Sequence, residues 1–361
     1  MPSYSVREIL SWVPLTKAVE VVKGGIPSVL PQEFFTLEEK VSGHTARMIE
    51  YKGTRKTSRI TNYGSVARSM ERVELGSRDI VLLSTREQIP FRDELVFILR
   101  NWEEYTPQQH FAMREIAFQG EQMRLRMENL EIAATLSSLV YGKIYFDSGG
   151  NLLPDNVGAS LVVDQGVPST NFLASSTLGG LWSNTMTNIV DQITTIKKKA
   201  IQASGYPLKY AIYGQDAAKH MAVNESLRYF WARNLDHNDS YLDSGVIPKK
   251  FLGLTWVPAY EAFYEDATGV VRELFPTDRV VFTPEITEAT WAFYRGSELV
   301  PTTLGMFGGA EQALNSFVEV FGRGRYARVY DNPVQIVDIA FDHFLPRMKV
   351  PNAYFVLDID S

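Results

Sequence analysis

The stretch between Pro107 and Gly142 constrains the fold more than any other part of the sequence, because about 35 residues pass without an internal proline. Thr106 and Pro107 supply an N-cap and a proline suited to the first helical position, and Gly142 supplies a stop signal. Apolar residues recur between them at helical spacing, namely Ile116, Met123, Met127, Leu130, Ala134 and Tyr141. The pattern predicts one helix over residues 106–142, about 50 Å long, in which Gly120 is a weak point that could mark a bend. A helix of that length must lean on a sheet or on neighbouring subunits, since it cannot form a core by itself.

Two segments of different character precede this helix. Residues 1–44 contain scattered prolines and glycines that prevent long regular elements, so they are interpreted as an extended arm. Residues 45–92 are rich in Thr, Ser, Val, Ile and Tyr, with glycines at 53, 64 and 76, which predicts a long β-hairpin or strand-like excursion.

The excursion is basic although the whole chain is acidic, with 36 basic and 42 acidic residues and a net charge of −6. Between Tyr51 and Arg72 a single acid, Glu71, faces six cations and leaves a local balance of +5; the cations are Lys52, Arg55, Lys56, Arg59, Arg68 and Arg72. The aromatics Tyr51 and Tyr63 are too few for a nucleic-acid groove. The six cations therefore form either a solvated face or an arm that contacts an acidic surface of a neighbouring copy, for which residues 236–275 supply an excess of acids.

The remainder of the chain predicts a mixed α/β lobe followed by a return in strands. Loops and one edge strand at 160–163 are expected over residues 147–184. Helices are expected at 187–204, 216–222 and 225–234, and strands at 208–213, 251–260, 270–275, 279–283 and 290–294. Strand character is also expected over 327–344, interrupted by a turn at Asp331-Asn332-Pro333, and over 353–359. Within the penultimate strand, the alternation over residues 335–342 predicts a half-exposed strand.

No catalytic site, metal site or cofactor site emerges from the sequence. The absence of cysteine excludes disulfides, thiolate zinc sites and cysteine nucleophiles. The five histidines are scattered, and the calcium-like spacing that begins at Asp236 lacks the required glycine and the bidentate acid. Gly322-Arg323-Gly324-Arg325 does not fit a phosphate-binding loop and is interpreted as a turn. Neither a signal peptide nor an apolar run of about eighteen residues is found, so synthesis and use in a cytoplasm are expected.

The order of these elements resembles the Hong Kong 97 fold of tailed-phage capsids, and more specifically the lambda-type major capsid protein, the E family. The resemblance spans nearly the whole chain and is carried by the order and spacing of several segments. These are Phe34-Phe35, the turns Gly53-Thr54-Arg55 and Gly64-Ser65, residues 143–154, Trp182 before the helix at 189–204, residues 206–220 and residues 330–344.

The resemblance implies an α+β fold with five parts: an N-terminal arm (1–44), an extended loop (45–92), a peripheral domain with the spine helix (93–183), an axial domain (184–317) and return strands (318–361). It implies a major capsid protein that self-assembles into hexamers and pentamers of an icosahedral virion shell around double-stranded DNA, without a membrane or a cofactor. A separate scaffolding protein, a portal and a decoration protein are the implied partners. Cross-linking of Lys52 or Lys56 to Asn352 of a neighbour would be the counterpart of a reaction in other members of the fold, but no residue pattern favours it.

Two alternatives stay open on the sequence. An encapsulin-type nanocompartment shell would share the fold but enclose enzymes instead of DNA. A soluble enzyme built on the α/β region at 184–284 would need a convergent polar site, which the sequence does not supply.

Overall fold

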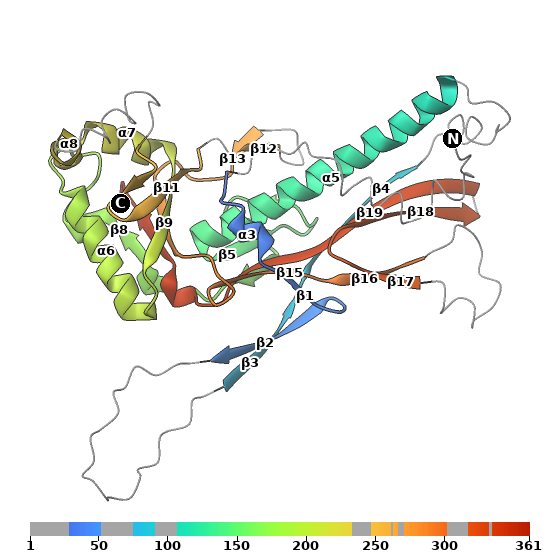
Figure 1. Cartoon of the computed structure of the whole chain (residues 1–361), viewed down its shortest axis with the longest axis horizontal. Coiled ribbons are helices and arrows are strands. Elements are labelled where there is room, and N and C mark those ends of the chain that lie inside the picture. Colours follow the sequence, from blue (N-terminus) through green and yellow to red (C-terminus); the bar gives the residue numbers. More distant parts are fainter. Residues whose placement is uncertain are drawn as a thin grey trace, which may run out of the picture.

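A long helix lies along a sheet of long strands, and a smaller lobe closes one end of the body (Figure 1). The computed structural model describes residues 29–51, 75–90, 107–232, 247–260, 263–265, 271–301, 317–331 and 334–361. The fold is mixed α/β, as the sequence predicts. Among these residues, no helix combines the length and the apolar character that crossing a membrane requires.

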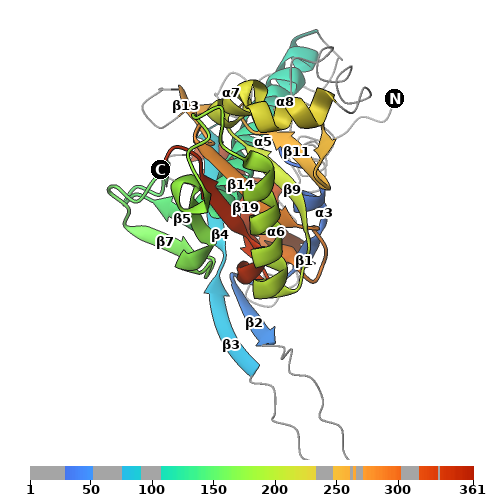
Figure 2. The same cartoon turned by 90° about the vertical axis from the view of Figure 1, so that its left-hand side faces the viewer.

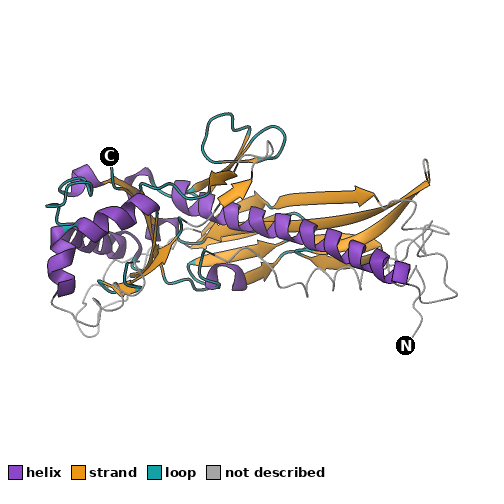
Figure 3. Cartoon of the chain, turned by 90° about the horizontal axis from the view of Figure 1, so that it is seen from above, coloured by secondary structure: helices purple, strands orange, loops and turns teal. Residues whose placement is uncertain are grey.

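The helix α5 (Pro107–Tyr141) confirms the predicted 106–142 helix to within a residue at each end. It runs unbroken through Gly120, and Gly142 ends it with a φ of +65°. Figure 3 shows α5 lying across one face of the long strands. Its inward face is buried at Ile116, Met123, Met127, Ala133, Ala134, Leu136, Leu139 and Val140.

The strands beneath α5 form a five-stranded sheet, here called the long-strand sheet. The path β1-β15-β19-β18 makes up four of its strands, and β4 also pairs with β19. The bounds are Glu38–Lys40 for β1, Leu83–Pro90 for β4, Trp291–Arg295 for β15, Gly324–Asp331 for β18 and Val334–Met348 for β19. Every residue from Val337 to Met348 is buried, so the prediction of a half-exposed strand over 335–342 is wrong. The helix α5 packs on one face of β19, through Met123 and Met127 against Ala340. Residues of the opposite face, Val337, Ile339 and Phe341, pack with Val300 and Val320.

The end lobe is built on a second sheet of six strands in the order β10-β11-β9-β14-β20-β8. The bounds are Lys250–Phe251, Leu254–Pro258, Leu208–Tyr213, Arg279–Pro284, Phe355–Asp358 and Phe172–Ala174 in that order. The helices α6 (Ile189–Ser204), α7 (Gln215–Val223) and α8 (Glu225–Ala232) belong to this lobe (Figure 1). Its core contains Trp182, Ile193, Trp256 and Phe282. The strand predicted at 251–260 is divided by a turn in which Leu252 has a φ of +52°.

The two lobes exchange strands across residue 317, the boundary that the resemblance implies between an axial domain and the return strands. β15 lies before this boundary in the chain but pairs with β19 of the long-strand sheet. β20 lies after it but pairs with β14 of the six-stranded sheet. Each sheet therefore contains a strand that comes from the part of the chain on the other side of residue 317.

Four small sheets surround these two. They are the hairpins β2–β3 (Thr45–Tyr51 and Leu75–Val81), β12–β13 (Phe263–Glu265 and Val271–Glu273) and β16–β17 (Ser297–Pro301 and Phe317–Phe321), and the sheet β6-β5-β7 (Leu152–Leu153, Lys143–Phe146 and Leu161–Asp164). The helix α3 (Glu33–Thr36) and the 3-10 turns at Ser169–Asn171, Ser175–Leu178 and Pro351–Ala353 complete the described elements. β7 lies at an edge of its sheet, as predicted for residues 160–163.

Candidate functional site: the hairpin root and the charge networks beneath it

The six cations predicted to contact a neighbouring copy lie outside the described residues; they are Lys52, Arg55, Lys56, Arg59, Arg68 and Arg72. The strands on either side of them in the sequence, β2 and β3, are described and pair antiparallel from Thr45–Val81 to Tyr51–Leu75. This hairpin leads away from the body (Figures 1 and 2). The described structure therefore contains the base of the predicted excursion.

The base of the hairpin, called the hairpin root, comprises Gly43–Ala46, Ile80–Leu82 and the Gly296-Ser297 pair. The Gly43 N–H donates to Ser297 Oγ at 2.7 Å, and the Ser297 N–H donates to the Gly43 carbonyl at 3.2 Å. The Leu82 N–H donates to the His44 carbonyl at 2.9 Å. Gly296 admits this close approach, because a Cβ there would lie 2.7 Å from Leu82 Cδ1 and 2.9 Å from the Gly43 oxygen.

Apolar packing fixes the same root to the long-strand sheet. Ala46, Ile80 and Leu82 are buried in one cluster with Phe293 and Phe344. The two phenyl rings stack with centroids 5.9 Å apart and planes 7° apart. Hydrogen bonds and apolar contacts thus both hold the hairpin at its base.

A buried histidine lies directly under the root. His343 of β19 is fully buried, and its Nε2 lies 2.7 Å from Glu298 Oε2. Its ring contacts the His44 ring edge-to-face at 4.6 Å. Glu298 also forms an ion pair with Arg86 of β4. Burial raises the pKa of Glu298, but the hydrogen bond from His343 and the charge of Arg86 outweigh it, so this pKa lies below its ordinary value.

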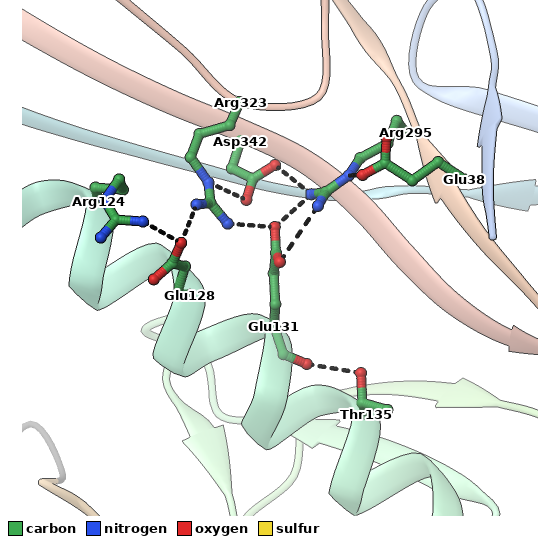
Figure 4. Close-up of polar contacts among 8 residues, drawn as sticks. All are labelled: Glu38, Arg124, Glu128, Glu131, Thr135, Arg295, Arg323 and Asp342. Atoms are coloured by element: carbon green, nitrogen blue, oxygen red, sulfur yellow. Dashed lines mark hydrogen bonds and ion pairs between the residues drawn. The ribbon is translucent and has the colours of Figure 1, made fainter. Parts of the chain in front are cut away.

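A second set of charges, the helix–sheet charge network, joins α5 to the sheet (Figure 4). Arg323 contacts Glu128 at 2.9 Å and Glu131 at 2.8 Å, both on α5. Arg295 forms ion pairs with Glu131, with Asp342 of β19 at 3.2 Å and with Glu38 of β1 at 2.8 Å. Together with Arg124, which pairs with Glu128, these residues link segments that are more than 200 positions apart in the sequence.

The two most buried carboxylates of this network differ in their protonation behaviour. Burial raises the pKa of Glu131, but Arg295 and Arg323 outweigh it and lower this pKa to about 2. Burial and the neighbouring Glu131 raise the pKa of Asp342 well above its ordinary value. The arginines therefore hold Glu131 as the charged partner, and the network couples the two carboxyl groups.

A third contact is a buried ion pair within the sheet. Arg325 of β18 and Asp338 of β19 are each about 1% exposed and are joined by three N–O contacts, one of them 2.9 Å long. Arg325 Nη2 also donates to the Ile116 carbonyl of α5 at 2.8 Å. Arg323 and Arg325 come from the Gly-Arg-Gly-Arg motif, so the turn expected there also supplies two arginines that bind the helix.

None of these three clusters has the geometry that a known catalytic constellation requires. The described residues also hold no group of three or more His, Asp or Glu side chains that could bind a metal ion. Their common property is that each one ties the long-strand sheet to α5 or to the hairpin root. Sequence reasoning missed Arg295, Arg323, Asp338, Asp342 and Glu298, since charged residues are ordinarily assigned to the surface. The arrangement is suited to holding a projecting hairpin at a fixed angle.

Comparisons with known proteins identify the family. A family model described as phage major capsid protein E matches residues 11–333, about nine-tenths of the chain. No curated protein matches. One similar solved structure is a phage-related protein of Bordetella bronchiseptica RB50, with 11% identity, coverage of 98% of each chain and a TM-score of 0.49. Another is the mature capsid of bacteriophage PhiM1, with 11% identity, coverage of 94% of this chain and 91% of that chain, and a TM-score of 0.47. The SrpI encapsulin of Synechococcus elongatus PCC 7942 is also similar, with 8% identity, coverage of 96% of this chain and 95% of that chain, and a TM-score of 0.45.

The family model extends from the segment before α3 to the residue before β19, and so it includes the hairpin, α5 and most of the end lobe. The chain belongs to the phage major capsid protein E family.

Proposed function

We propose that the chain assembles through contacts between its own copies into hexamers and pentamers, which form an icosahedral Hong Kong 97-type shell around double-stranded DNA of a tailed phage. As a member of its family, the chain is a structural protein of the virion and not an enzyme. The observation that carries the proposal is the hairpin that leads away from the body on a rigid root, because such an element cannot bury its surface within one subunit.

The parts of the chain are assigned roles within this shell. The residues 45–92 act as the extended loop that lies over a neighbour, and α5 acts as the spine helix of the peripheral domain. The region 184–317 supplies most of the axial lobe, which meets its equivalents around the symmetry axes. The strand exchange between the lobes supports a subunit that moves as one body, since β15 and β20 each cross to the other sheet.

Charge complementarity supports a specific contact between copies. The basic segment from Lys52 to Arg72 carries a balance of +5, whereas residues 236–275 hold seven acids against three cations. Opposite charges on two segments of one chain favour association in a fixed register. The six cations are proposed to dock on the acidic segment of a neighbouring subunit. A scaffolding protein, a portal and a decoration protein are proposed as further partners, and the host cytoplasm as the place of assembly.

Charge reversal tests the docking role. The variant R55E/R59E/R68E/R72E should keep the circular dichroism spectrum of the folded subunit but fail to form closed shells in negative-stain electron microscopy. The matched control K198E/K199E/K219E/R228E reverses four exposed cations outside both the basic segment and the acidic segment, and it should still form empty shells. Normal shells from the first variant would remove the docking role.

Expression with and without the neighbouring phage genes tests the nature of the shell. Uniform shells that retain nuclease-protected DNA when packaging genes are present are expected. Shells that hold a protein cargo would instead favour the encapsulin function, and a persistently small soluble species would refute assembly.

A further inference from the structure

The described lysines divide into two groups according to their partners. Lys143, Lys209, Lys219 and Lys349 each form an ion pair with a carboxylate, and Lys40 lies over the Phe321 ring. No carboxylate of the described chain lies within ion-pair distance of the other five, which are Lys197, Lys198, Lys199, Lys249 and Lys250. These five gather on two adjoining segments and are called the lysine patch.

The lysine patch is formed by α6 and the start of β10. Lys197 Nζ donates to the Leu252 carbonyl at 2.7 Å, which ties α6 to the turn after β10. The turn admits this contact at Gly253, where a Cβ would lie 3.2 Å from Lys197 Nζ. Lys198, Lys199, Lys249 and Lys250 are exposed. Figure 2 shows α6 on the face of the lobe toward the viewer, so its outer side is not covered by another described element.

Acidic residues are almost missing from these two segments. α6 contains one acid, Asp191, and residues 247–260 contain none, because the seven acids counted between residues 236 and 275 lie on either side, at 236–243 and 261–273. The patch is thus a concentration of positive charge on a chain whose net charge is −6. Charges within about 8 Å of one another act together at physiological salt, so neighbouring lysines reinforce a local positive potential.

We propose that the lysine patch contacts the phosphate backbone of double-stranded DNA inside the assembled shell. Lysine is a compact, strongly hydrated charge that binds phosphate without reading bases, whereas base readout in the major groove commonly uses arginine, and the described patch has none. Lysine is also depleted from the cores of protein interfaces, which makes a polyanion a better partner than a neighbouring subunit. The contact is weak, independent of sequence and sensitive to salt. This proposal rests on the proposed function, which supplies the enclosed DNA. It requires that the solvent-exposed side of α6 faces the interior of the shell.

A matched pair of full-length variants tests the binding on unassembled subunits. K198Q/K249Q/K250Q removes three charges from the patch, and K143Q/K209Q/K219Q removes three lysines that pair with carboxylates. The probe is a labelled random-sequence duplex, measured by fluorescence anisotropy over a salt series. The patch variant should bind at least about tenfold more weakly at low salt, with a slope of log affinity against log salt that is smaller by about 2 to 3. The control should stay within about twofold of the unmodified chain.

Equal DNA affinities of the two variants would overturn the proposal. A patch variant that bound DNA normally but failed to form shells would assign the lysines to contacts between copies instead. Because the assay uses unassembled subunits, its failure is distinguishable from a failure of shell formation.

The absence of cysteine permits a direct test of position. A single Lys198→Cys substitution provides the only thiol of the chain. A bulky polyethylene-glycol maleimide should label this thiol in dissociated subunits but not in intact shells. Rapid labelling of intact shells would place the patch on the outer surface and exclude contact with packaged DNA.

Discussion

Gly120 of α5 lies where any side chain would collide with Arg325 of β18: a Cβ at position 120 would be 1.9 Å from the guanidinium Nη1 and 2.5 Å from its carbon. The guanidinium cannot move aside cheaply, because Asp338 and the Ile116 carbonyl hold it. Gly120 is therefore not a bend in the helix. It is the place where an arginine from the sheet reaches the helix backbone.

Gly120→Ala should destabilise the subunit by about 1 to 3 kcal/mol, as overpacking of a filled interior does. Helix propensity alone predicts the opposite, a gain of about 1 kcal/mol. Urea unfolding of unassembled subunits measures the difference, with Gln122→Ala on the exposed face of the same helix as the control. A stabilised G120A variant would show that the guanidinium is free to move.

Arg325→Met should cost about 3 to 5 kcal/mol of unfolding free energy, since it leaves the Asp338 carboxylate buried without a partner. The double variant R325M/D338L removes both charges and should recover a large part of that loss. Thermal or urea unfolding of the single and double variants gives the comparison. A double variant as unstable as R325M would mean that the packing of the arginine side chain, rather than its charge, supplies the stability.

Arg295→Met should also cost about 3 to 5 kcal/mol, because Glu131, Asp342 and Glu38 would then share fewer cations in a buried site. Arg126→Met is the control on the neighbouring α5 surface: Arg126 is 73% exposed and pairs with Glu87 at 3.3 Å, so its loss should cost under about 1 kcal/mol. Similar losses in the two variants would argue against a cooperative network.

The sequence predicted those elements whose evidence is local. The 107–141 helix is marked by its caps and its apolar spacing, and the strand at 208–213 by a short apolar run between turn signals. Helix α6 was predicted over 187–204 and spans Ile189–Ser204; its start is set by Asn188, whose side chain accepts from the Asp191 N–H at 3.1 Å, and Gly205 follows its end. Such signals need no knowledge of distant residues.

The candidate site could not be predicted in the same way, because its partners are distant in the sequence. Asp338 and Asp342 alternate with apolar residues and so suggested a face in water, but arginines from β15 and β18 and from the turn before β18 neutralise them inside the body. The strand exchange of β15 and β20 was hidden for the same reason. Pairing over more than 40 residues leaves no local pattern in either strand.

Gly296→Ala should loosen the hairpin root. The new Cβ would lie within 3.0 Å of Leu82 Cδ1, the Gly43 oxygen and His343 Cβ, so the backbone contact must shift. Hydrogen exchange of the Gly43 and Leu82 amides should become at least about tenfold faster, and fewer closed shells should form. Ser42→Ala, an exposed change next to the root, should leave both measurements unchanged. Unaltered exchange in G296A would show that the root tolerates the methyl group.

A fall in pH should lower the unfolding free energy of the subunit, in part through protonation of Glu298. Its folded-state pKa lies below the ordinary value of 4.5, so the unfolded chain binds the proton first as the pH falls. The stability that Glu298 contributes is therefore fully present above about pH 4.5 and is lost progressively below it. At pH 7, Glu298→Gln should destabilise the subunit, because Arg86 and His343 lose a charged acceptor. The difference in unfolding free energy between this variant and the unmodified chain, here called the gap, should become smaller below pH 4.5.

Urea unfolding at pH 7, 4.5 and 3.5 measures this gap. Glu285→Gln, which removes an exposed partner of Lys209, serves as the control and should change the unfolding free energy by under about 1 kcal/mol. A gap for E298Q that stays constant from pH 7 to pH 3.5 would mean that the Glu298 charge does not stabilise the hairpin root, and that the hydrogen bond from His343 serves equally well with a neutral acceptor.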